Sequence, residues 1–197
     1  QACFSGLWIQ SHEHPDAVAE LGDLCRQEDW RLAVWDIDAG LRSASGQPFD
    51  LEAADPLSAV RTLGALADDE TASILVLKNF HRYLGSPEII QAVTQAVVEG
   101  KTRRTILVVL SPVVQLPVEL EKLFVVIEHA LPDRQQLHQI ASEIATDDGE
   151  LPEGDDLTAV IDAASGLTRN EAENAFAIGD NNSAHVVRVN SALFCRK

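Results

Sequence analysis

The chain has 197 residues, 46% of them hydrophobic, so it can fold as one domain with a core, or as a domain with a small appendage. Its 15 Lys and Arg residues against 31 Asp and Glu residues give a formal net charge of -16, which opposes binding of duplex nucleic acid or an anionic membrane. No apolar run reaches the roughly 18 residues of a membrane span, and three scattered cysteines without a CxxC pair signal neither a disulfide framework nor a zinc site.

Short apolar strands alternate with amphipathic helices over residues 1–130, which predicts a parallel sheet covered by helices on both faces. The expected strands are residues 7–10, 32–37, 73–78, 105–110 and 124–127. The expected helices are residues 15–28, 55–67 and 86–99, with a short one at 118–122. Residues 38–54 are predicted to form a long loop, and Gly100 is expected to end the third helix.

The chain changes character after residue 130, because strands stop and helices are expected at 133–145, 155–164 and 169–178. These helices predict a small lid over residues 131–178, with an acidic linker at 146–154. The remaining residues, 179–197, form a tail of uncertain role, in which 185–194 alternate like a strand. The predicted domains are therefore an α/β core (1–130), a helical lid (131–178) and the tail (179–197).

The order of strands and helices is that of a P-loop NTPase, but the phosphate-binding loop is missing. Strand 7–10 runs through Ser11 to Asp16 straight into a helix, where such an ATPase carries Gly-x-x-x-x-Gly-Lys-Ser/Thr. That loop works because glycines let backbone N–H groups approach the phosphates while a lysine neutralises their charge. The third strand ends in Lys78 and Asn79, where acidic residues hold magnesium in P-loop ATPases. The sequence thus predicts a five-stranded parallel sheet of P-loop NTPase type without its phosphate and magnesium sites.

Three segments carry a resemblance to a known family: ILVLKNFHRY (74–83), LSPVVQLPVEL (110–120) and GLTRNEAENAF (166–176). With the order of elements, they resemble the N-terminal, Walker-less half of a bacterial and plastid AAA+ ATPase family known from a hypothetical chloroplast open reading frame. The resemblance implies an AAA+ core with its lid, located in the bacterial cytoplasm or the plastid stroma. It also implies a second, complete ATPase module in the parent protein, which would bind ATP and magnesium. The start at Gln1 and the lack of methionine likewise predict a segment of a longer protein.

The resemblance also places three candidate nucleotide contacts. Ser111 ends the strand that bears a γ-phosphate-sensing polar residue in AAA+ proteins, and Asn79 ends the central strand. Arg169 starts a lid helix, roughly where a second sensor arginine can lie. Two of them have a plainer interpretation, because Ser111 precedes a proline turn and Arg169 can be a solvated residue at a helix start. Residues 119–122 contain no arginine, so no arginine finger is predicted there.

The best local candidates for a contact follow the central strand, at the edge where open α/β sheets place ligands. They are Phe80, His81, Arg82 and Tyr83. The alternative is that both aromatic residues pack beneath the lid while His81 and Arg82 are solvated.

A metal motif is weaker. His12 and His14 with Glu13 offer two imidazoles and a carboxylate but no third placed ligand, so no metal site is predicted.

We therefore expect a non-catalytic AAA+-like domain, without catalytic residues or a cofactor of its own, that acts as an interaction or regulatory module. Its expected partners are its own C-terminal ATPase module, other subunits or further copies of itself. The alternative is a unit that binds or hydrolyses ATP through an unconventional phosphate site. A third, weaker possibility is single-stranded nucleic acid binding through a few basic residues, namely Arg103, Arg104, Arg188, Arg196 and Lys197.

Overall fold

The computed structural model describes residues 4–43, 45–49, 51, 53–67, 71–145 and 151–179. The strands are β1 (Gly6–Gln10), β2 (Arg31–Asp36), β3 (Gly40–Ser43), β4 (Ser73–Lys78), β5 (Thr105–Ser111) and β6 (Phe124–Glu128). The helices are α1 (His14–Glu28), α2 (Pro56–Leu66), the 3-10 helix η1 (Phe80–Tyr83), α3 (Pro87–Arg103), α4 (Arg134–Ile144), α5 (Gly154–Ala164) and α6 (Arg169–Gly179). The chain divides between His129 and Ala130 into two compact units, which we term the α/β unit and the helical unit.

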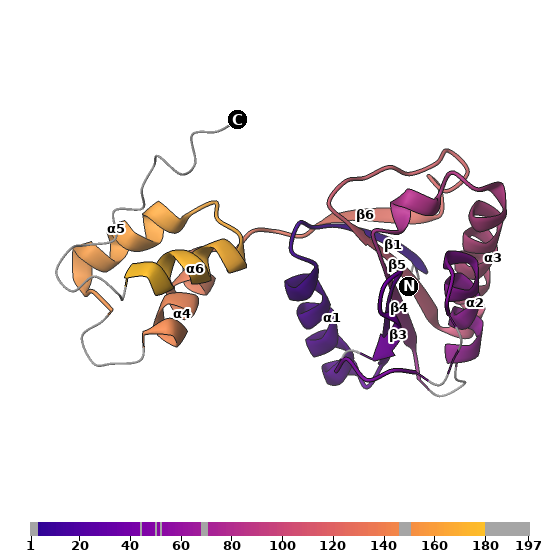
Figure 1. Cartoon of the computed structure of the whole chain (residues 1–197), viewed down its shortest axis with the longest axis horizontal. Coiled ribbons are helices and arrows are strands. Elements are labelled where there is room, and N and C mark those ends of the chain that lie inside the picture. Colours follow the sequence, from indigo (N-terminus) through magenta and orange to yellow (C-terminus); the bar gives the residue numbers. More distant parts are fainter. Residues whose placement is uncertain are drawn as a thin grey trace. The chain divides into compact units, whose positions relative to one another are not determined.

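The α/β unit contains one sheet with the strand order β3-β2-β4-β5-β1-β6, and all neighbouring strands except β2 and β3 run parallel. Helix α1 lies on one face of the sheet, and α2 and α3 lie on the other (Figure 1). A buried apolar layer fills each side, with Trp8 and Trp35 on the α2 and α3 side and Ala17 and Cys25 on the α1 side. The predicted α/β fold with helices on both faces is confirmed.

The sheet has a sixth, antiparallel strand, so the prediction of five strands with a long loop at 38–54 was wrong at β3. The carboxylate of Asp36 closes the turn that precedes β3, because its Oδ1 accepts the N–H groups of Asp38 (3.1 Å) and Ala39 (2.6 Å). Gly40 then adopts a φ of +68°, which a glycine reaches without steric cost. Leu41 is buried in the core, which anchors β3 at the edge of the sheet.

Two further local predictions were wrong. Helix α3 continues past Gly100 to Arg103, and its C-cap Arg104 takes a left-handed conformation with φ 54°. A Cβ at Gly100 would lie 2.4 Å from the carbonyl oxygen of Thr105, so this glycine serves close packing rather than helix termination. The segment 118–123 forms turns instead of the expected short helix.

The helical unit has a core of its own. Helices α4, α5 and α6 pack together around Leu137, Ile140, Ile161 and Phe176. The predicted tail, apart from Gly179, and part of the predicted acidic linker (146–150) lie outside the described residues, as do the basic residues Arg188, Arg196 and Lys197. No helix in the described part of the chain is long and apolar enough to cross a membrane.

Asp55 caps helix α2 and gives the first testable prediction. Its side chain accepts the N–H groups of Ser58 and Leu57, and these bonds, chiefly those to Ser58, hold the pKa of Asp55 below its usual value. Stability from this charged cap is therefore present above the ordinary pKa and lost as the pH falls through the lowered one. Asn accepts the same bonds at any pH. We expect wild type to exceed Asp55→Asn in Tm at about pH 6 and to lose that advantage progressively as the pH falls below the ordinary carboxyl pKa, measured by circular dichroism. A Tm difference independent of pH would contradict this role.

Candidate functional site

The connection between β1 and α1 occupies the place of the phosphate-binding loop, and it spans only Ser11 to Glu13. Its polar groups are engaged, because Ser11 Oγ accepts the N–H of Glu13 (3.0 Å) and the Ser11 N–H donates to the carbonyl oxygen of Ser111 in β5 (3.0 Å). Pro15 in the first turn of α1 has no N–H to offer an anion, and Asp16 adds a negative charge there. This connection is therefore too short and too poor in donors to surround phosphates as a P-loop does.

The end of β4 carries a cation rather than a magnesium ligand. Lys78 Nζ lies 3.7 Å from Asp36 Oδ2, so the ammonium group partly neutralises that carboxylate. Asn79 is exposed, takes a left-handed conformation, and donates its backbone N–H to the carbonyl oxygen of Leu110 (2.8 Å). Because Mg²⁺ favours carboxylate oxygens that are free of cations, this edge is a poor magnesium site.

Both proposed sensor residues have local partners. Ser111 is fully buried and its hydroxyl donates to the carbonyl oxygen of Val113 (2.7 Å), within the turn that follows β5. Arg169 is bound inside the helical unit, with Nε 2.9 Å from Glu173 Oε1 and Nη2 3.4 Å from Glu143 Oε2. These contacts favour the plainer structural interpretation of each residue over a role in sensing nucleotide.

The segment after β4 is more buried than a contact surface would be. Phe80 has 0% exposure, and its ring centroid lies 5.8 Å from that of Trp35 and 5.5 Å from that of Tyr83. His81 is 7% exposed, and its buried Nδ1 has no hydrogen-bond partner among the described residues. Only Arg82 is exposed in this group of four. Phe80 thus belongs to the core, and the available part of the segment is its polar side.

Basic groups gather at the carboxyl edge of the sheet, although the whole chain is acidic. The pKa of His14 is lowered first by burial and then by the nearby charges of Lys78, His81 and His12. Burial also lowers the pKa of His81, with a further contribution from Arg82. The sequence did not reveal this group, because His12 and His14 follow β1, whereas Lys78 is the last residue of β4 and His81 follows that strand.

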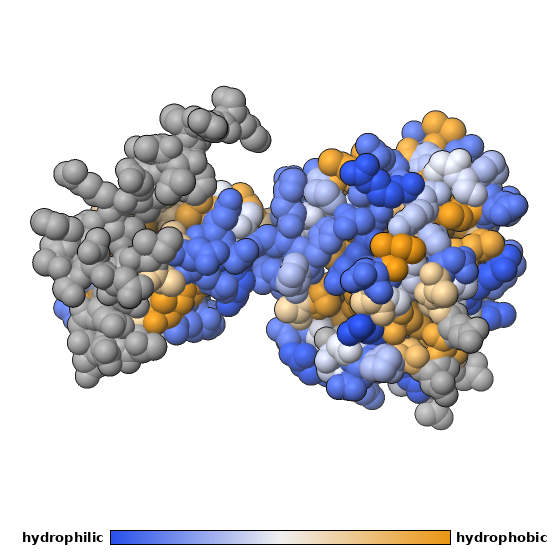
Figure 2. All heavy atoms as spheres, viewed as in Figure 1, coloured by the Kyte–Doolittle hydropathy of each residue, from blue (hydrophilic) through white to orange (hydrophobic). Residues whose placement is uncertain are grey.

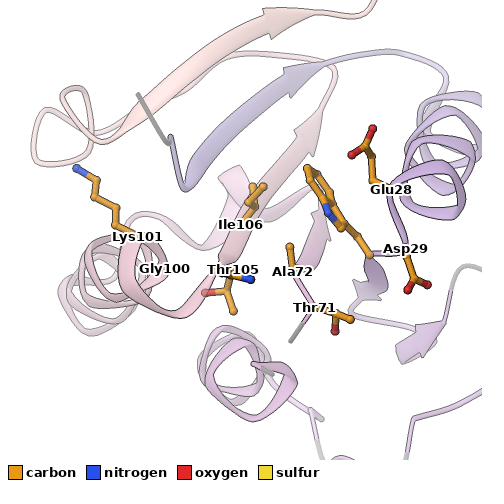
Figure 3. A pocket seen from close by; sticks show the side chains of 10 residues that line it. Glu28, Asp29, Thr71, Ala72, Gly100, Lys101, Thr105 and Ile106 are labelled. Carbon is orange, nitrogen blue, oxygen red and sulfur yellow. The ribbon is translucent and has the colours of Figure 1, made fainter. Parts of the chain in front are cut away.

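A pocket of about 360 Å³ lies at the opposite edge of the sheet, near the starts of β2, β4 and β5. Figure 3 shows Lys101 of α3 on one side of it and Glu28 and Asp29, at the end of α1, on the other. Ligands of open α/β sheets bind at the carboxyl ends of the strands. The position and mixed charges of this pocket therefore do not mark it as the functional site.

The family model described as "SpoVK-like AAA ATPase, N-terminal domain" matches residues 1–129. The chain belongs to this SpoVK-like family. The matched residues end where the α/β unit ends, at His129. The prediction of the N-terminal region of an AAA+ ATPase is thereby confirmed. No curated protein matches the chain.

Solved AAA+ structures share the fold of this SpoVK-like domain. A structure of the Escherichia coli MS115-1 HORMA:CdnC:Trip13 complex has TM-score 0.58 and 11% sequence identity to this chain. The match covers 96% of this chain and 70% of the chain in that structure. The Caenorhabditis elegans PCH-2 structure matches 91% of the chain and 55% of its own (TM-score 0.55, 10% identity). The FIGL-1 AAA domain in complex with ADP matches 99% of the chain and 73% of its own (TM-score 0.57, 14% identity). At these identities the similarity establishes the P-loop NTPase fold alone.

Proposed function

We propose that this SpoVK-like domain is a Walker-less AAA+ domain that serves as an interaction or regulatory module of a larger ATPase. The observation that carries the proposal is the connection from Ser11 to Glu13, a three-residue turn in the place of a phosphate-binding loop, in which the N–H and the hydroxyl of Ser11 are already hydrogen-bonded. The cation at the end of β4 and the engaged hydroxyl of Ser111 support it. The resemblance to the family of the chloroplast open reading frame belongs to the same proposal.

An apolar edge provides a surface for the proposed contacts. Among the described residues β6 is an outer strand of the sheet, and no other described strand pairs with its second side. Val126 and Ile127 on this strand are 47% and 44% exposed, and Val118 before it is 75% exposed. Figure 2 shows other apolar side chains on the visible face of the α/β unit as separate patches among hydrophilic ones. The β6 edge is thus suited to a protein partner, which we propose to be the ATPase module of the same protein or another subunit.

The proposal also includes the cofactor, the lid and the location of the protein. The domain itself binds no nucleotide, and ATP with magnesium is bound by the ATPase module of the parent protein. The helical unit has the position of an AAA+ lid in the chain order. The location is the bacterial cytoplasm or the plastid stroma.

The first test is nucleotide binding by this chain. We expect no heat in calorimetry with millimolar ATP or ADP and magnesium, because the chain lacks a phosphate cradle. Nucleotide at 100 times its Kd would add about 2.7 kcal/mol of stability and raise Tm by about 5–10 °C, so thermal unfolding is an independent readout. Micromolar binding by either method would contradict the proposal.

The contact role is tested by sedimentation of the chain mixed with the ATPase module of its parent protein. We expect Val118→Asp and Ile127→Asp to weaken a complex that wild type forms. Val98→Asp is the matched control, since Val98 is 52% exposed but lies on α3. No complex with wild type, or equal weakening by all three variants, would count against the β6 edge.

One observation favours a second candidate, a phosphate-binding unit of unconventional kind. The basic group around His14, Lys78 and His81 lies at the edge where α/β folds bind ligands, and the buried Nδ1 of His81 has no partner among the described residues. Because the pKa of His14 and that of His81 are lowered, phosphate binding here would strengthen as the pH falls. Phosphate affinity that rises at low pH and drops in Lys78→Ala would favour this candidate.

A further inference from the structure

Three side chains that the sequence holds far apart meet beside the start of α1. Asp16 and Glu20 lie one turn apart on α1, and His129 directly follows β6. Nε2 of His129 lies 3.4 Å from Glu20 Oε2 and 3.9 Å from Asp16 Oδ2. One nitrogen and two carboxylate oxygens of this set all lie within 4.8 Å of one another. The three residues therefore form a compact set of metal-ligating groups inside the α/β unit.

The imidazole of His129 is held in place. Its backbone N–H donates to the carbonyl oxygen of Gln10 (2.9 Å), and its Nδ1 lies 2.9 Å from Ser11 Oγ. Ser11 is buried, and its Oγ also accepts the N–H of Glu13, so the oxygen is itself fixed. When Nδ1–H donates to Ser11 Oγ, the lone pair of Nε2 faces the two carboxylates. An oxygen that orients the second ring nitrogen is the usual support of a metal-binding histidine.

The surroundings of His129 Nε2 would stabilise a cation. This nitrogen is shielded from solvent and has no hydrogen-bond partner in the described part of the chain, although two carboxylates are near. A cation between Nε2 and the two carboxylate oxygens would be bound by all three atoms and would give the buried nitrogen a partner.

The distances and the donor set select the ion. In a tetrahedral zinc site with bonds of about 2.0–2.1 Å, ligand atoms are separated by about 3.3 Å. The separations of 3.4 and 3.9 Å around Nε2 approach this value with small side-chain movements. An imidazole with two carboxylates suits zinc and its neighbours better than Mg²⁺ or Ca²⁺, which favour sites made only of oxygen. Glu20 is 58% exposed, so an ion has access from its side.

We propose that Asp16, Glu20 and His129 bind a divalent transition-metal ion of the zinc type. Three protein ligands leave a fourth position for water or a further ligand. His129 is the last residue of the α/β unit, so a bound ion ties the start of the connection to the helical unit onto α1. This site is independent of nucleotide binding.

The test is a Zn²⁺ titration of the whole chain after treatment with a chelator, followed by calorimetry and by thermal unfolding at neutral pH. We expect one zinc ion per chain and a rise in Tm of about 5–10 °C when zinc is at 100 times its Kd. His129→Ala abolishes both, and Glu20→Gln weakens the affinity at least about tenfold. Because Glu20 is more than half exposed, Glu20→Gln keeps the fold even if the loss of His129 disturbs it.

Matched controls separate this site from other zinc ligands. His138→Ala on α4 and Glu28→Gln at the end of α1 should bind zinc as wild type does. Co²⁺ in the site should give visible absorption that His129→Ala removes. Zinc binding that survives in His129→Ala but is lost in His12→Ala or His14→Ala would overturn the assignment. Absence of binding at millimolar zinc would also overturn it.

Discussion

Phe80→Ala is expected to lower the free energy of unfolding of the α/β unit by about 3–5 kcal/mol, the largest effect of any change considered. Phe80 is completely buried, and its ring packs edge-on against Trp35 and close to Tyr83. Alanine removes these contacts and leaves a cavity under η1 that a close-packed core fills only in part. Urea unfolding followed by tryptophan fluorescence measures the change, because Trp35 borders the lost ring.

Arg82→Ala is the control for this prediction. Arg82 lies two positions away on the same 3-10 helix but is exposed, so its removal should change stability by no more than about 0.5 kcal/mol. Phe80 was a candidate contact residue from the sequence, and the two variants distinguish the roles. If Phe80→Ala unfolds like wild type but no longer binds a partner, the aromatic ring is a contact residue and the packing argument is wrong.

The parallel part of the fold was predictable because its signals are local and strong. β4 and β5 are unbroken aliphatic runs, which is the pattern of strands covered on both faces. β3 was missed because four residues, Gly40 to Ser43, stand among glycines and small polar residues that favour loops. What places this strand is the carboxylate of Asp36, which closes the turn, and a pattern of hydrophobic residues does not report such a bond.

The candidate site was predictable only where its evidence lies in one stretch of sequence. That the Gly-x-x-x-x-Gly-Lys-Ser/Thr pattern does not occur from Ser11 to Asp16 can be seen from those residues alone, because a P-loop has a fixed spacing of glycine and lysine. The partners of His129 could not be found this way, since Ser11 lies 118 positions earlier in the chain. A histidine two positions after the expected strand 124–127 was the available signal, and it acquires meaning only once β6 is placed beside β1.

The same limit applies to Phe80, because its position after the central strand is evident from the sequence but its complete burial is not. An aromatic residue at the carboxyl end of a central strand can point to a ligand or into the core. The pairing of β2 with β4 distinguishes these two roles. It places Trp35 opposite Leu77, close to the end of β4, where the Trp35 ring contacts that of Phe80 in the core. Sheet order, which comes from pairing between distant segments, therefore determines which residues remain available for function.

Gly100→Ala is expected to destabilise the chain by about 3 kcal/mol, even though alanine favours helices more than glycine does. The new Cβ would lie 2.4 Å from the carbonyl oxygen of Thr105 and 2.9 Å from the Cβ of Ser5. The first contact is with backbone, which cannot rotate away, so α3 must move off the start of β5. At roughly 2–4 °C per kcal/mol, Tm should fall by about 6–12 °C in a calorimetric scan.

Gly64→Ala is the matched control, since Gly64 also lies inside a helix, α2, but on its exposed side. The nearest atom to its new Cβ is Nη1 of Arg103 at 3.4 Å, the end of a flexible side chain. Here the gain in helix propensity should prevail and raise stability by about 0.5–1 kcal/mol. Opposite signs for the two substitutions would show that Gly100 is required by the close approach of α3 and β5. Stabilisation by both would mean that α3 can shift at little cost, and that the contact between α3 and β5 does not fix the helix.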